Sequence, residues 1–199
     1  LQAQGVEHAT RVDDLTNGTA AIRFTTEDTH ARIKRLEAAA ALKELREERR
    51  AIIEWLSPLQ FLRRQSDIFN GKILMGEKLL DSDEFKAWSE ARPWILVGYG
   101  MPGSGKTVLA SIVVDRLRKN LKPAGVPVLC MYLNYKERNQ TLPNLIGSLL
   151  KQLIQFEDDD FRSPEVRKLF REAAREASPL LDDLYEALRA EVMTFPRYE

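Results

Sequence analysis

Apolar residues are grouped along this chain in two ways, in short unbroken runs and at helical spacing. The unbroken runs occupy residues 94–97 and 126–133, and such runs are typical of strands covered on both faces of a parallel sheet. Elsewhere the apolar positions recur every three or four residues, which predicts amphipathic helices over 107–120 and 141–153. Strands that alternate with helices predict an α/β fold, here a partial three-layer parallel sheet with helices on its faces.

The first part of the chain has a different pattern. Residues 1–30 are polar without a clear period and contain the turn signal Asn17-Gly18, so we expect a flexible or loosely helical segment. Strong helix formers dominate residues 31–58 and predict a long charged helical linker that Pro58 ends. Its spacing is compatible with a coiled coil, although one amphipathic helix lying on the following domain is the simpler interpretation. The spaced positions are Ala38, Leu42, Leu45, Arg49, Ile52, Leu56 and Leu59.

Shorter helices are predicted in the remaining domain, which we place at residues 59–199. Two of them, Phe61–Phe69 and Glu77–Trp88, are separated by Asn70-Gly71. Ser163-Pro164 and Ser178-Pro179 each combine a capping residue with a proline, the typical start of a helix.

One motif in this domain carries recognisable chemistry. It fits the P-loop pattern G-x-x-x-x-G-K-[ST] at every fixed position and lies between a predicted strand and a predicted helix, the context that supports the motif. Glycines let phosphates approach the backbone, whose N–H groups at the helix N-terminus bind them. The predicted nucleotide-binding residues are Gly100, Met101, Pro102, Gly103, Ser104, Gly105, Lys106 and Thr107.

Two side chains of the motif have individual roles in this interpretation. Lys106 places its charge on the β- and γ-phosphates of a nucleoside triphosphate, and the Thr107 hydroxyl is the predicted Mg²⁺ ligand. A glycine turn that precedes a helix by chance is the alternative. ATP or ADP with Mg²⁺ is therefore the expected cofactor.

Composition narrows the possible partners. Lys+Arg and Asp+Glu are both 30, and this zero net charge gives no indication of a basic surface for nucleic acid.

The single cysteine, Cys130, lies in an apolar run and is interpreted as a small buried hydrophobe. No apolar stretch approaches the roughly 18 residues of a membrane-spanning helix, and no signal peptide is visible, so we expect a cytoplasmic protein. The acidic residues 157–160 and the histidines His8 and His30 are interpreted as solvent-exposed groups rather than metal ligands.

Around the P-loop, the sequence resembles the NACHT-type STAND P-loop NTPases, in particular the fungal group whose nucleotide domain is nephrocystin-like at its N-terminus. The similarity covers roughly residues 55–194, and Lys78 stands where the family pattern usually has tryptophan. The matching segments are Trp55-Leu56-Ser57-Pro58-Leu59, Gln65-Ser66-Asp67-Ile68, Leu79-Leu80-Asp81-Ser82, Glu84-Phe85, Trp88, Pro102–Ser111, Asn134-Tyr135-Lys136, Gln140-Thr141, Asn144-Leu145 and Leu149–Leu153.

This resemblance implies the ATP-binding part of a signalling switch related to innate-immunity or self/non-self recognition proteins. Exchange of ADP for ATP would open such a protein for assembly, with self-association through the NTPase domain or the N-terminal helix. P-loop NTPases also need a carboxylate at the end of another strand, and no later run of four or more apolar residues ends in Asp or Glu. We therefore expect no catalytic residue here, a sequence that stops before its Walker B motif, and ATP hydrolysis only by a complete domain. The start at Leu1 is likewise typical of a piece of a longer protein.

Two other functions fit the same residues. A P-loop phosphotransferase shares the strand, loop and helix, but it needs an acceptor site that no motif here indicates. A non-catalytic helical interaction module would keep the P-loop only as a vestige.

Overall fold

The computed structural model describes residues 2–70, 76–90, 95–156, 163–173 and 180–196, with side chains from residue 29 onward apart from that of Glu90. The chain divides into two units, residues 1–48 and 49–199. Each unit is described by itself below.

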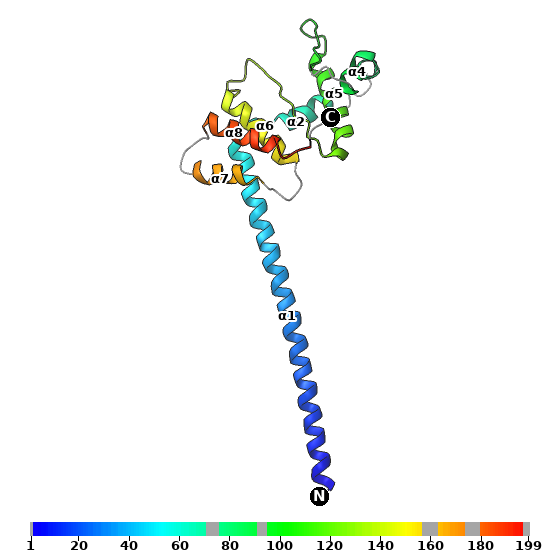
Figure 1. Ribbon diagram of the computed structural model, residues 1–199, viewed down its shortest axis with the longest axis vertical. Helices are drawn as coiled ribbons and strands as arrows, with labels where there is room; N and C mark the ends of the chain where they lie inside the picture. The colour runs from blue at the N-terminus through cyan, green and yellow to red at the C-terminus, as the bar shows by residue number, and fades with distance from the viewer. Residues whose placement is uncertain (1, 71–75, 91–94, 157–162, 174–179, 197–199) are drawn as a thin grey trace. The chain divides into compact units, whose positions relative to one another are not determined.

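The first unit consists of the greater part of helix α1 (Gln2–Leu56), which is drawn in blue to cyan in Figure 1. The helix begins well before the predicted start at residue 31, and the turn predicted at Asn17-Gly18 is absent. No proline precedes Pro58, and a single glycine inside a helix costs only about 1 kcal/mol. Among the described side chains of this unit, the large apolar residues Ile33, Leu36 and Leu42 are exposed.

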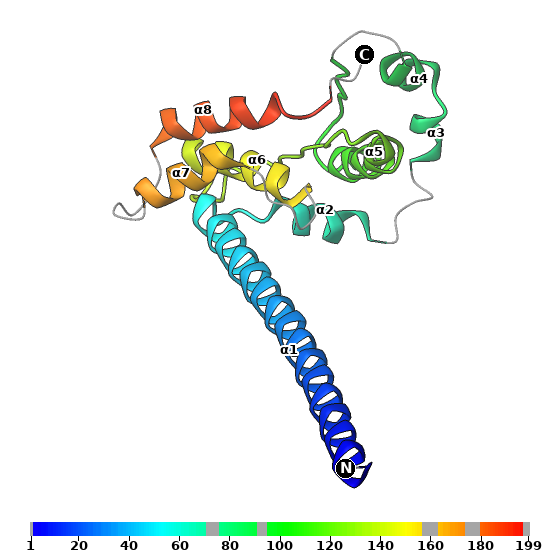
Figure 2. The ribbon, with the colours of Figure 1, turned by 60° about the horizontal axis from the view of Figure 1, so that its bottom comes forward.

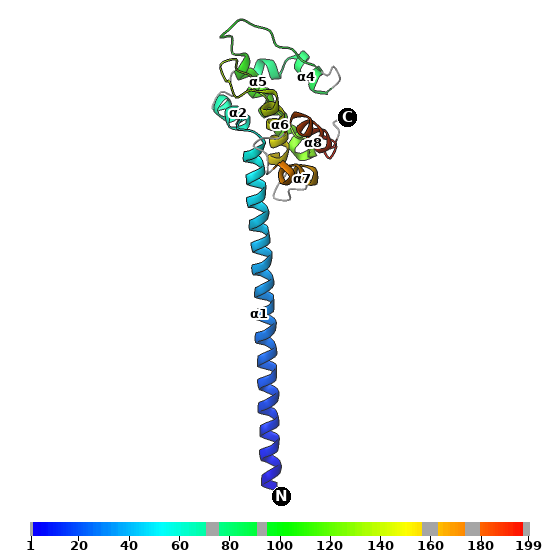
Figure 3. The ribbon, with the colours of Figure 1, turned by 90° about the vertical axis from the view of Figure 1, so that its left-hand side faces the viewer.

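The second unit contains the last turns of α1 and the remaining helices, which Figures 1 to 3 show from three directions. In chain order these helices are α2 (Phe61–Phe69), α3 (Glu77–Leu80), α4 (Asp83–Glu90), α5 (Lys106–Leu121), the 3₁₀ turn η2 (Lys122–Ala124), α6 (Leu142–Phe156), α7 (Pro164–Ala173) and α8 (Leu181–Val192). Helix α8 packs on α6 and α7, whereas α5 packs on α2.

Several helices agree with their predicted positions. The prediction of Phe61–Phe69 is confirmed at both ends, and α7 begins at Pro164, as the Ser163-Pro164 pair predicts. The helix predicted after Thr141 is α6, which begins at Leu142. The single helix predicted over Glu77–Trp88 is instead two, because the chain turns at Asp81 and Ser82. The start predicted at Ser178-Pro179 lies outside the described residues.

The predicted α/β fold is wrong, because the described part of the chain is mostly helical and contains no strand or sheet. The run predicted as the first strand is described only from Ile95, and Ile95–Gly100 has no regular secondary structure. The run at 126–133 likewise forms no ladder of backbone hydrogen bonds with another described segment. A β-strand is defined by such bonds to a neighbour, so an apolar run alone does not make one.

Side chains take the place of a neighbouring strand beside residues 126–134. The amide of Gln152 accepts a hydrogen bond from the Cys130 N–H at 3.0 Å and donates one to the Cys130 carbonyl at 2.9 Å. The amide of Gln140 does the same farther along, between the carbonyl of Tyr132 and the N–H of Asn134. These bonds satisfy backbone groups that would otherwise be costly to bury.

The main hydrophobic core of the second unit lies between the end of α1 and helices α6, α7 and α8. Its fully buried members are Ile52, Leu56, Leu150, Ile154, Val166 and Leu184. A smaller cluster joins Leu59, Phe61, Cys130 and Tyr132. The interpretation of Cys130 as a small buried residue is confirmed, since its side chain is 7% exposed.

Polar contacts fix the end of α1 against α6. The buried Lys151 ammonium donates to the carbonyl of Ser57 at 3.0 Å, and the Ser57 hydroxyl donates to the carbonyl of Asn144 at 2.7 Å. Burial lowers the pKa of Lys151, and the Glu54 carboxylate opposes that shift. At Gly147 an added Cβ would lie 2.1 Å from the Leu56 carbonyl oxygen, so only glycine permits this approach of the two backbones.

Candidate functional site

The P-loop residues lead directly into helix α5. Gly103 and Gly105 have φ angles of +83° and +85°, in the left-handed region that favours glycine. Gly105 occupies the N-cap position of α5, and no side chain caps the helix. Among the described residues, the first-turn N–H groups of Lys106 and Thr107 have no backbone partner. The helix therefore presents free donors and the positive end of its dipole.

The loop is closed on itself by its lysine. The Lys106 ammonium donates to the carbonyl of Gly100 at 2.7 Å and to that of Met101 at 2.9 Å. The N–H of Ser104 donates to the same Met101 carbonyl at 3.1 Å. An ammonium has three donors, so these two bonds leave one N–H of Lys106 for another acceptor.

Gly100 lies beside Ser104 in the loop. A Cβ added to Gly100 would lie 2.6 Å from the Ser104 hydroxyl oxygen, so a side chain there would require that hydroxyl to move. Around it the loop faces solvent, with Tyr99 90% and Met101 78% exposed. The residues from Gly100 to Thr107 thus form a small exposed ring of backbone groups at the start of a helix.

Thr107, the predicted Mg²⁺ ligand, is exposed in the first turn of α5. The described residues hold no cluster of three or more His, Cys, Asp or Glu side chains that could bind a metal ion. His30 is exposed, as expected, whereas residues 157–160 and the His8 side chain lie outside the described part.

Helix α5 is bound to α2 and to the segment around Tyr132 by buried polar residues that the sequence pattern did not single out. The Gln65 amide on α2 donates to the Ser111 carbonyl at 2.8 Å, and the Tyr132 hydroxyl donates to the Gln65 amide oxygen. Burial raises the pKa of Tyr132 to about 12. Burial also raises the pKa of the Cys130 thiol, an effect that the nearby Arg118 guanidinium opposes. The only signal in the sequence was the presence of glutamines on apolar helix faces.

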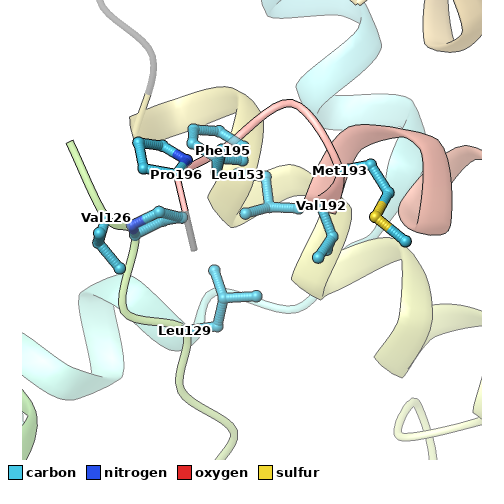
Figure 4. Close-up of a pocket in the computed structure, with 8 residues that line it drawn as sticks. Val126, Leu129, Leu153, Val192, Met193, Phe195 and Pro196 are labelled. Carbon is cyan, nitrogen blue, oxygen red and sulfur yellow. The ribbon is translucent and has the colours of Figure 1, made fainter. Parts of the chain in front are cut away.

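A separate apolar cleft of about 300 Å³ lies away from these loop residues. Figure 4 shows it between the segment after η2, helix α6 and the chain beyond α8. Its lining residues are Val126, Pro127, Leu129, Leu153, Val192, Met193, Phe195 and Pro196. The cleft therefore offers hydrophobic contact and no charged group.

None of the described helices combines the length and the apolar character that crossing a bilayer requires.

Comparison with known proteins places the chain in a family. The profile of the family described as "Nephrocystin 3, N-terminal" matches residues 75–198, which include the whole P-loop and helices α5 to α8. The chain belongs to this family, and the nephrocystin-like part of the resemblance is confirmed.

A curated relative is also similar over a short stretch. The chain is 33% identical over 63 residues to a protein named "ORC1-type DNA replication protein" from Cenarchaeum symbiosum (strain A). The match covers 32% of this chain and only 15% of that protein. No solved structure matches the chain significantly.

Proposed function

We propose that this chain binds ATP or ADP, with Mg²⁺, through the loop from Gly100 to Thr107. The observation that carries the proposal is the loop before α5, which Lys106 closes and in which Gly103 and Gly105 have backbone angles that disfavour a side chain. A loop of this kind places backbone donors around an anion at a helix N-terminus.

The individual residues fit a phosphate chain. Lys106 has one donor beyond the two that hold the loop closed, and its charge suits an anionic oxygen. The first-turn N–H groups of α5 supply neutral donors beside it. Bound Mg²⁺ would neutralise phosphate charge, with the Thr107 hydroxyl as its protein ligand and phosphate oxygens as further ligands.

We further propose that nucleotide binding serves a STAND-type signalling switch of the NACHT class, working in the cytoplasm. Family membership in the nephrocystin 3 N-terminal group and the resemblance of the segments around the loop support this role. ATP is preferred to GTP through the resemblance alone. The zero net charge gives no support for a DNA-binding role like that suggested by the name of the archaeal relative.

Calorimetric titration with Mg-ATP and Mg-ADP tests the binding site. Lys106→Ala should weaken binding at least about 30-fold, because losing a charge partner of a phosphate typically costs about 2–5 kcal/mol. Lys119→Ala is the matched control: it removes an exposed lysine near the other end of α5 that is paired with Asp115. Circular dichroism should show equal helix content for all three proteins.

Equal affinity of the Lys106→Ala variant and the unchanged chain would overturn the proposal and favour an interaction module. Thr107→Ala sharpens the test, because it should weaken binding in Mg²⁺ but not in EDTA. An equal loss in both conditions would exclude the Mg²⁺ role of Thr107. Transfer of the γ-phosphate to an added acceptor would favour the phosphotransferase instead.

A further inference from the structure

Along one edge of residues 126–134, the backbone groups are hydrogen-bonded to side chains. Every second residue there bonds to a side chain: Val128 through its carbonyl to Arg118, Cys130 to Gln152, and Tyr132 and Asn134 to Gln140. A period of two is that of an extended chain, in which alternate residues turn their N–H and C=O groups to opposite edges. The side chains of Arg118 on α5, Gln152 on α6 and Gln140 just before α6 thus cover the edge formed by the even-numbered residues.

The opposite edge has no such cover. Within the described part of the chain, the backbone groups of Leu129, Met131 and Leu133 have no hydrogen-bond partner. The side chains of Met131 and Leu133 are 46% and 69% exposed. Leu129 also lines the apolar cleft of Figure 4. A free edge beside an apolar cleft is the arrangement that binds an added extended segment, through backbone bonds and a pocket for an apolar side chain.

A second segment of the same chain also has exposed apolar side chains and, within the part that the structure describes, backbone groups without hydrogen bonds. Ile95, Leu96 and Val97 are 75%, 39% and 56% exposed, and their backbone makes no hydrogen bond among the described residues. In this structure the segment makes no backbone hydrogen bond with residues 126–134. The chain therefore carries both an apolar extended segment and an open edge able to receive one.

We propose that the edge at Leu129–Leu133 binds the segment Ile95–Val97 of a second copy of this chain. Pairing between copies would satisfy both sets of backbone groups and cover both sets of apolar side chains. The zero net charge leaves no overall repulsion between copies to oppose it. Because donor segment and acceptor edge are different surfaces, the contact is head-to-tail, and it forms a closed ring or a growing chain of copies.

A complementation experiment with the full chain tests this pairing. The acceptor variant Met131→Pro removes an edge N–H, and the donor variant Ile95→Lys/Val97→Lys makes the segment polar. Sedimentation velocity should show assemblies larger than a monomer for the unchanged chain, and only monomers for either variant alone. An equimolar mixture of the two variants should form a pair of one copy of each, because the intact donor segment of one variant then meets the intact edge of the other.

Controls separate this contact from misfolding and from other associations. Tyr135→Lys changes a residue that is 94% exposed outside the edge and should associate like the unchanged chain. If Met131→Pro lowers helix content, Leu133→Lys serves as the acceptor variant. The proposal is overturned if the unchanged chain stays a monomer at all concentrations, if either variant alone associates as the unchanged chain does, or if their mixture forms no pair. Nucleotide binding does not enter this test, so its failure would leave the proposed function standing.

Discussion

Two regions of the second unit meet opposite physical demands. At the core of α6 and α8, Leu150, Ile154 and Leu184 are completely buried, and even the polar Lys151 and Gln152 are 4% exposed with backbone partners. At the loop before α5, Tyr99 and Met101 are almost fully exposed, and the glycines have left-handed backbone conformations. The first region is rich in buried contacts, whereas the second is rich in open backbone donors.

The difference indicates where stability and binding are located. Burial of apolar area is the dominant favourable term in folding, so the free energy of unfolding should depend mainly on the core around α6. The loop contributes little buried area, and its conformation serves close approach of a ligand. Substitutions in the core should therefore change stability, and substitutions in the loop should leave it nearly unchanged. The quantity that tests this difference is the free energy of unfolding.

The largest effect is expected at the centre of the core. Leu150→Ala should lower the free energy of unfolding by about 2–5 kcal/mol, because it removes buried methyl groups and leaves a cavity. Met101→Ala, at the exposed loop, should change it by less than about 0.5 kcal/mol. Urea denaturation followed by circular dichroism measures both. Equal losses from the two variants would break the comparison.

A smaller effect is expected where side chains replace a strand. Gln152→Leu keeps a side chain of similar size but leaves the N–H and C=O of Cys130 without their partner. Each of these two buried groups costs about 1–3 kcal/mol when it is left unpaired, and the apolar burial of leucine offsets part of that cost. We therefore expect a net loss of about 1–2 kcal/mol in the free energy of unfolding, measured by the same urea denaturation. Gln155→Leu on the same helix is the control, because Gln155 is exposed. If both variants are as stable as the unchanged chain, the backbone bonds of Gln152 do not support residues 126–134.

The smallest effect should appear only in alkali. Burial raises the pKa of Tyr132 from 10.0 to about 12, so between these values the unfolded chain loses this proton before the folded chain does. The folded state binds more protons there, and stability falls as the pH rises, by about 2 kcal/mol at pH 11.5. Tyr132→Phe should remove this part of the alkaline loss.

The measurement is urea denaturation at pH 8 and pH 11.5 for the unchanged chain, Tyr132→Phe and Tyr135→Phe. Tyr135 is 94% exposed, so its variant should lose stability like the unchanged chain. Cys130 and Lys151 remain in all three proteins, so the comparison reports the change at Tyr132. Identical pH dependence of all three would contradict the burial effect at Tyr132.

Local patterns in the sequence were enough for many helices and for the conformation of the loop. The Phe61–Phe69 helix and the start of α7 at Pro164 follow from apolar spacing and from capping residues. Gly103 and Gly105 of the P-loop pattern occur where the backbone has left-handed angles. The nephrocystin-like family was indicated by the ordered set of residues around the P-loop rather than by the loop alone.

The tertiary structure alone decided whether the apolar runs became strands. A helix closes its hydrogen bonds within four residues of sequence, so spacing and caps are visible locally. A strand needs a neighbour from elsewhere in the chain, and an apolar run such as 126–133 says nothing about which groups will face its backbone. Here those groups are the side chains of Gln152, Gln140 and Arg118. Their role depends on how the helices pack, because contacts between residues distant in sequence leave no local pattern.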